Sequence, residues 1–137
     1  MDKRKNIILL FLGDFFYDAR CINMALSIIK SKKFNLSILS CADPLKTKKY
    51  SNNELEGAVH KNKFYQFKDS LRGPLRYWFY HKHIAKTLKN KKYDIIIAAD
   101  LFSLSGACSQ KTKIVFDSRE IYSELEAHAN KPIHRLF

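Results

Sequence analysis

Residues 94–100 have the sequence Asp94-Ile95-Ile96-Ile97-Ala98-Ala99-Asp100, an apolar run that lies between two acids. A short β-branched run without polar alternation is typical of a strand that is covered on both faces, as strands are in a parallel sheet. Two further runs have the same character: residues 7–12, which end at Gly13, and residues 113–117, which end in Asp117. These three runs predict strands of one parallel sheet.

Helical patterns separate the strands. Apolar side chains recur at helical spacing in residues 19–32, and Gly73-Pro74 precedes a second helical run whose apolar face holds Tyr77, Tyr80, Ile84 and Leu88. The predicted elements are strands at 7–12, 34–39, 64–67, 94–100 and 113–117, helices at 19–32, 74–90 and 104–110, a loop at 41–62 and a polar helical segment at 118–129. This alternation predicts an α/β, three-layer Rossmann-like domain with a parallel sheet, formed by residues 1–137.

The composition combines an ordinary apolar content with a large positive charge. The 137 residues are 46% hydrophobic, and 25 Lys and Arg against 13 Asp and Glu give a net charge of +12. Such an excess favours an anionic partner, which could be nucleic acid, a membrane surface or a phosphate-bearing substrate. A lysine-rich solvated surface would explain the excess equally well.

The cysteines and the N-terminal apolar run bear on the cellular compartment. Cys21, Cys41 and Cys108 lack the spacing of a disulfide framework or a zinc site, which indicates reduced thiols in a cytosolic protein. The apolar run at 7–12 is too short for a signal-peptide core or a membrane span. We therefore expect a cytoplasmic protein.

Polar side chains follow three of the predicted strands. In an open α/β sheet, ligands bind outside the carboxyl ends of the strands, so these side chains are candidates for one binding site. The candidates are Gly13, Asp14, Asp18 and Arg20 after the first strand, Asp100 after the fourth, and Asp117, Ser118, Arg119 and Glu120 after the fifth.

Each candidate also has a structural interpretation. Asp18 and Asp100 precede helices, and either carboxylate could cap the helix that follows. Arg20 could pair with Asp14 or Asp18, and Asp117 could brace a neighbouring loop. Arg119 and Glu120 favour a functional interpretation, since a buried strand that leads into adjacent opposite charges indicates a site.

Missing motifs narrow the chemistry. The four glycines cannot form the G-x-G-x-x-G fingerprint of dinucleotide binding or a P-loop. His, Cys and acidic residues show no metal-ligand spacing, so no metal is predicted, and no G-x-S-x-G nucleophile elbow is present.

Two blocks of the chain resemble the N-terminal domain of the family 4 retaining glycosyltransferases, which have the GT-B architecture. In that family a block similar to D-I-I-H-A-H-D-L-F-S-L precedes a block similar to Y-D-S-H-E-L-Y, and residues 94–104 and 116–122 occupy these places here. Gly13, Asp18 and Arg20 add a weaker likeness. The chain departs from the pattern where Arg119 replaces a histidine and where Ala98 and Ala99 precede Asp100.

The resemblance implies transfer of a sugar from a nucleotide-sugar donor to a glycan or lipid-linked acceptor with retained configuration and without a required metal or other cofactor. It implies that this domain forms the acceptor side, with the substrate-binding residues Gly13, Asp18, Arg20, Asp100, Asp117 and Arg119. Arg119 and Glu120 are the candidate catalytic residues, and no general base is assigned.

The resemblance also implies that residues 1–137 are an incomplete part of a larger enzyme. The family binds the donor nucleotide mainly on a C-terminal domain, so we expect this chain to be inactive alone and a separate C-terminal domain to be a partner. The lysine excess fits an enzyme that rests on an anionic membrane at its cytoplasmic face.

Three other functions are alternatives to sugar transfer. A non-catalytic α/β interaction module needs no second domain, and the replaced histidines favour it. A nucleic-acid binder is suggested by the net charge alone, because the aromatic residues at 77–80 have helical rather than stacking-platform spacing. A receiver-like phosphoacceptor domain lacks a clear acid pair and partner lysine.

Overall fold

The computed structural model describes residues 4–42, 63–68 and 74–118, and for residues 42 and 63–68 it describes the backbone alone. Within these residues the elements are β1 (Lys5–Leu10), the 3-10 turn η1 (Phe15–Tyr17), α1 (Ala19–Lys30), β2 (Phe34–Ala42), β3 (Lys63–Lys68), α3 (Pro74–Lys89), β4 (Ile95–Ala98), α4 (Leu101–Ala107) and β5 (Lys113–Phe116). No helix of this described part is long and apolar enough to cross a membrane.

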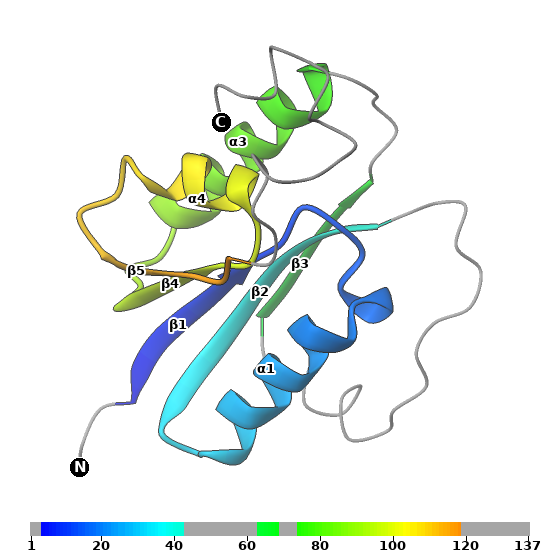
Figure 1. Cartoon of the computed structure of the whole chain (residues 1–137). Coiled ribbons are helices and arrows are strands. Elements are labelled where there is room, and N and C mark those ends of the chain that lie inside the picture. Colours follow the sequence, from blue (N-terminus) through cyan, green and yellow to red (C-terminus); the bar gives the residue numbers. More distant parts are fainter. Residues whose placement is uncertain (1–3, 43–62, 69–73, 119–137) are drawn as a thin grey trace.

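The strands form one five-stranded sheet in the order β3-β2-β1-β4-β5, and every neighbouring pair is parallel. The chain moves outward from β1 to β2 and β3, and then returns through α3 to the other side of β1 (Figure 1). The strand order therefore reverses between β1 and β4, which is the Rossmann arrangement. The prediction of a Rossmann-like α/β domain with a parallel sheet is confirmed.

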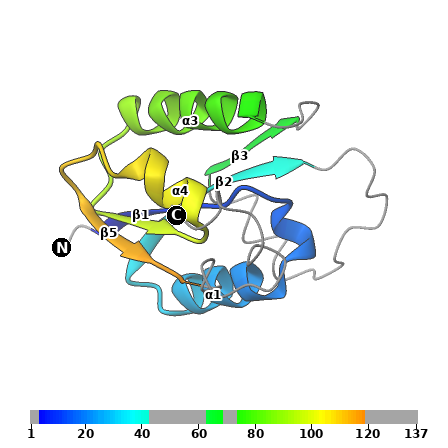
Figure 2. The same cartoon turned by 45° about the horizontal axis from the view of Figure 1, so that its top comes forward.

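Helices cover both faces of the sheet. α1 lies on one face, while α3 and α4 lie on the other (Figure 2). Successive side chains of a strand point to opposite faces, so Ile7 and Leu9 of β1 contact the α1 layer while Ile8 and Leu10 contact the α3 layer. This double coverage explains why the first strand is apolar at consecutive positions.

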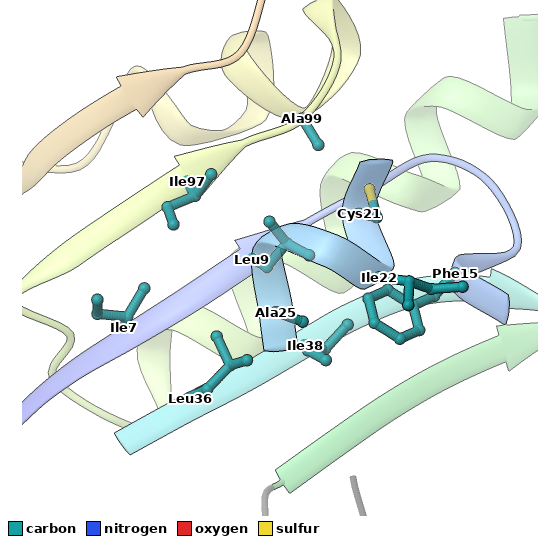
Figure 3. Packing of buried hydrophobic residues seen from close by; sticks show 10 residues of the cluster. All are labelled: Ile7, Leu9, Phe15, Cys21, Ile22, Ala25, Leu36, Ile38, Ile97 and Ala99. Atoms are coloured by element: carbon teal, nitrogen blue, oxygen red, sulfur yellow. The ribbon is translucent and has the colours of Figure 1, made fainter. Parts of the chain in front are cut away.

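The core beneath α1 draws on several elements. Ile22 and Ala25 of the helix point towards Leu9 of β1 and Ile38 of β2 (Figure 3). Phe15, which is fully buried, closes the end of this cluster beside Ile22. The 3-10 turn that carries Phe15 was absent from the sequence prediction.

The last strand corrects one prediction. β5 forms an edge of the sheet, and Val115 and Phe116 remain 45% and 38% exposed. The expectation of a buried strand before residues 119 and 120 was therefore wrong. A β-branched run at a sheet edge has the same sequence signature as one at the centre, because the pattern does not record whether a second neighbouring strand is present.

Candidate functional site

Three loops meet at the carboxyl edge of the sheet, at the point where the strand order reverses. The Ala99 N–H donates to the Leu10 carbonyl (3.0 Å) and the Asp117 N–H to the Ala98 carbonyl (2.9 Å), so each strand end is tied to the next. We call the residues that these loops and the start of α1 place here the switch-point rim: Gly13, Asp18, Arg20, Asp100 and Asp117. Ligands of open α/β sheets bind at such reversals.

Asp100 joins two of these loops. Its Oδ1 accepts the Ser103 N–H at 2.8 Å, which caps α4, and its Oδ2 accepts the Leu12 N–H at 2.8 Å, which holds the loop after β1. The Ser103 hydroxyl also donates to Oδ2 at 2.8 Å. The capping interpretation of Asp100 is confirmed, and α4 begins at Leu101 rather than at 104 because the cap lies at Asp100.

A buried tyrosine extends this arrangement to α3. The Tyr80 hydroxyl lies 2.5 Å from the Ser103 hydroxyl, and both side chains are fully buried. The Ser103 hydroxyl donates to Asp100, so Tyr80 is the donor of the Tyr80–Ser103 bond. Burial raises the pKa of Tyr80 well above its usual value, and the nearby Asp100 charge adds to the rise. The sequence pattern places Tyr80 on the apolar face of α3 and carries no signal of this polar role.

The Tyr80→Phe variant is expected to be less stable than the wild type by about 1 kcal/mol at pH 8, because one buried hydrogen bond is lost. The difference should shrink above pH 10. There an unfolded tyrosine releases its proton while Tyr80 in the fold keeps it, so the wild-type free energy of unfolding falls with pH by this term and that of the variant does not. Urea unfolding at pH 8, 9.5 and 10.5 measures both effects. A gap that stays constant across this range would contradict the ionisation argument.

Gly13 packs the loop after β1 against β2. Its carbonyl accepts the Cys41 N–H at 2.9 Å and the Ser40 hydroxyl at 2.8 Å. The buried Ser40 hydroxyl in turn accepts the Phe15 N–H at 2.9 Å. A Cβ at Gly13 would lie 2.6 Å from the tip of the Phe11 ring, so a side chain at this position would displace that ring. Ser40 was missed in the sequence because a serine in a strand run carries no signal of such a role.

Asp18 acts as the cap of α1. Its Oδ1 accepts the Cys21 N–H at 2.7 Å, and its carbonyl accepts the Ile22 N–H at 3.0 Å. Asp14 has the same role one turn earlier, where its Oδ1 accepts the Phe16 N–H at 3.1 Å. The capping interpretation of Asp18 is confirmed, while contact with a ligand stays a prediction.

Arg20 and Asp117 form an ion pair across the rim. The Arg20 Nη2 lies 2.6 Å from the Asp117 Oδ1, which joins the first turn of α1 to the end of β5. The Arg20 side chain is 55% exposed and the Asp117 side chain 14% exposed. The expected partners of Arg20, Asp14 or Asp18, were wrong, because β5 lies closer to the start of α1 than the order of residues in the chain suggests.

Two candidates cannot be placed. Arg119 and Glu120, the candidate catalytic residues, lie outside the described residues, as does the predicted helical segment beyond residue 118. Ser118, which directly precedes Arg119, is exposed at the rim end of β5. In the described ranges no group of three or more His, Cys, Asp or Glu residues could hold a metal ion.

Comparison with known proteins leaves the family open. Neither the protein-family models nor the curated proteins compared with this chain match it.

Proposed function

We propose that this chain contributes the acceptor side of a glycosyl-transfer site located at the switch-point rim. The observation that carries the proposal is the meeting of three strand-end loops where the strand order reverses, with the half-exposed Arg20 held over them by Asp117. The likeness of residues 94–104 and 116–122 to the family 4 glycosyltransferases supplies the reaction class.

Arg20 gives this rim its chemistry. A guanidinium is always charged and offers paired N–H donors that match a phosphate group. Asp117 fixes one of these donors, and the remaining exposed part of Arg20 faces solvent, where the phosphate of a lipid-linked acceptor could bind. The donor nucleotide would bind on a separate domain, and Arg119 and Glu120 would lie beside the acceptor hydroxyl.

A titration followed by NMR tests the proposal. Addition of a short-chain polyprenyl-diphosphate sugar is expected to shift the amide signals of Gly13, Asp14 and Ser118. The Arg20→Ala variant should bind at least fivefold more weakly, while its free energy of unfolding changes by less than about 1 kcal/mol because the Arg20 side chain is more than half exposed to solvent.

The control removes the same charge at the opposite edge of the sheet. Arg4 is exposed just before β1, so Arg4→Ala should leave binding unchanged. Equal loss in the two variants, or shifts that avoid the rim, would refute the acceptor site. Product formed from nucleotide sugar and acceptor by this chain alone would refute the separate donor domain.

A second candidate is a non-catalytic binding module. One observation favours it: the carboxylates of Asp18 and Asp100 are engaged in caps and loop contacts rather than directed at a ligand. Such a module would bind neither the acceptor sugar nor a nucleotide sugar, so the same titration separates the two functions.

A further inference from the structure

The outward face of α3 carries three large apolar side chains. Leu75, Trp78 and Phe79 are 58%, 52% and 40% exposed. They follow one another at helical spacing, while Tyr80 and Ile84 of the opposite face are buried against the sheet. The fold therefore uses the other face of α3, and these three residues contribute little to the core.

The rest of this face is cationic. The Lys82 Nζ lies 3.7 Å from the centre of the Trp78 ring, and Lys86 and Lys89 continue the exposed side of the helix. The sequence of α3 holds four basic residues and no acid, since Arg76 accompanies the three lysines. We call Leu75, Trp78, Phe79, Lys82 and Lys86 the α3 outer face.

We propose that the α3 outer face binds the surface of an anionic lipid membrane. Trp and Phe favour the boundary between headgroups and acyl chains, where an apolar ring and a polar surrounding meet. Lysines beside them attract anionic headgroups, and their long aliphatic stems let the ammonium groups reach the phosphates. Aromatic anchors and lysines on one helix face are the features of a helix that lies in the plane of the interface.

The charge and the exposed apolar side chains of this face together favour an anionic membrane over two other partners. A second copy of the chain in a twofold dimer would bring the cationic faces together, which is unfavourable. Nucleic acid would be attracted by the lysines, but phosphate contacts make no use of the exposed leucine and phenylalanine. An anionic membrane uses both kinds of side chain.

The position of this face bears on the rim. Helices that connect parallel strands run antiparallel to them, so α3 begins at the carboxyl edge of the sheet. Tyr77 stacks on Phe102 with 4.0 Å between ring centres, and Phe102 lies two residues after Asp100. Membrane binding through Leu75, Trp78 and Phe79 would bring the rim to the headgroup level, where a lipid-linked acceptor is found. This last step rests on the proposed function, whereas membrane binding itself does not.

Trp78 provides a direct measurement, because it is the single tryptophan of the chain. Vesicles of phosphatidylcholine with 30% phosphatidylglycerol should shift its emission to the blue and protect it from iodide, and pure phosphatidylcholine vesicles should have a much smaller effect. Co-sedimentation should weaken at least tenfold when the salt rises from 0.1 to 0.5 M. These vesicles contain no acceptor, so the result is independent of sugar transfer.

Two pairs of variants locate the binding face. One double variant combines Leu75→Ser with Phe79→Ser, and the other combines Lys82→Glu with Lys86→Glu. Each should weaken vesicle binding at least tenfold. The controls are Val115→Ser with Phe116→Ser at the exposed edge of β5, and Lys30→Glu with Lys33→Glu at the end of α1, on the opposite face of the sheet. Each control should change binding less than threefold.

Several results would overturn the proposal. An unchanged Trp78 emission with anionic vesicles, or equal losses in the two lysine pairs, would show that no specific membrane face exists at α3. Suppose instead that the Lys82→Glu, Lys86→Glu double variant loses binding to a single-stranded oligonucleotide while it still binds vesicles. That result would assign the face to nucleic acid.

Discussion

Replacing Asp100 by alanine is expected to lower the free energy of unfolding by about 3 kcal/mol. The variant loses the cap of α4, because the Ser103 N–H no longer finds the carboxylate. It also leaves the Leu12 N–H and the Ser103 hydroxyl without the acceptor that they share. Unsatisfied donors in a partly buried position cost more than the bonds themselves contribute.

A serine at the same position separates the two roles of Asp100. The Asp100→Ser variant keeps a hydroxyl that can cap the Ser103 N–H but lacks the second oxygen that holds the Leu12 N–H. It should therefore lie between the wild type and Asp100→Ala. Urea unfolding curves of the three proteins give the order of their free energies of unfolding. A value for Asp100→Ala within about 1 kcal/mol of the wild type would show that the contacts of Asp100 do not stabilise the fold.

The Asp100→Ser variant also tests the role of Asp100 in the switch-point rim. The Leu12 N–H bond is the direct tie between Asp100 and the loop after β1, so its loss should increase hydrogen exchange at Leu12, Gly13 and Asp14 more than at Ser103. If Asp100 acts only as a helix cap, exchange should instead rise chiefly in α4. The comparison distinguishes a residue that shapes the rim from one that merely begins a helix.

The architecture of this domain could be predicted from its periodicity. Uninterrupted apolar runs at 7–12 and 95–99 indicate strands with two covered faces, and the amphipathic pattern of 19–32 indicates the helix between strands. Element ends were less accurate because they depend on contacts from elsewhere in the chain. The loop after β1 begins at Phe11 rather than at Gly13, and the Leu12 N–H donates to the Asp100 carboxylate instead of to a neighbouring strand.

The candidate site was predictable in its location but not in its bonds. A parallel sheet brings the residues that follow its strands to one edge, so the sequence predicts that Asp18, Asp100 and Asp117 share a region of the molecule. Which acid meets Arg20 depends on the strand order, and residues 20 and 117 become neighbours only when β4 and β5 lie beside β1. The link from Tyr80 to the rim could not be predicted, because it depends on the buried hydroxyl of Ser103 in α4.

Replacing Gly106 by leucine is expected to destabilise the protein by about 3 kcal/mol. Gly106 lies in α4 where this helix crosses α3, and a Cβ added to it would lie 2.5 Å from the Ile84 Cδ1 and 3.3 Å from the His81 Cδ2. Ile84 is fully buried and has little space in which to move. The better helix propensity of leucine offsets about 1 kcal/mol at most, so overpacking decides the sign.

Ser105 offers a matched control for this overpacking. It precedes Gly106 in α4 but is exposed, so Ser105→Leu adds the same side chain without meeting α3 and should change stability by less than about 0.5 kcal/mol. A second test combines Gly106→Leu with Ile84→Ala, which frees space at the contact. In the Ile84→Ala background, Gly106→Leu should lower the free energy of unfolding by less than it does in the wild type. Additive losses in this cycle would contradict the packing argument, because independent sites add whereas a shared steric contact does not.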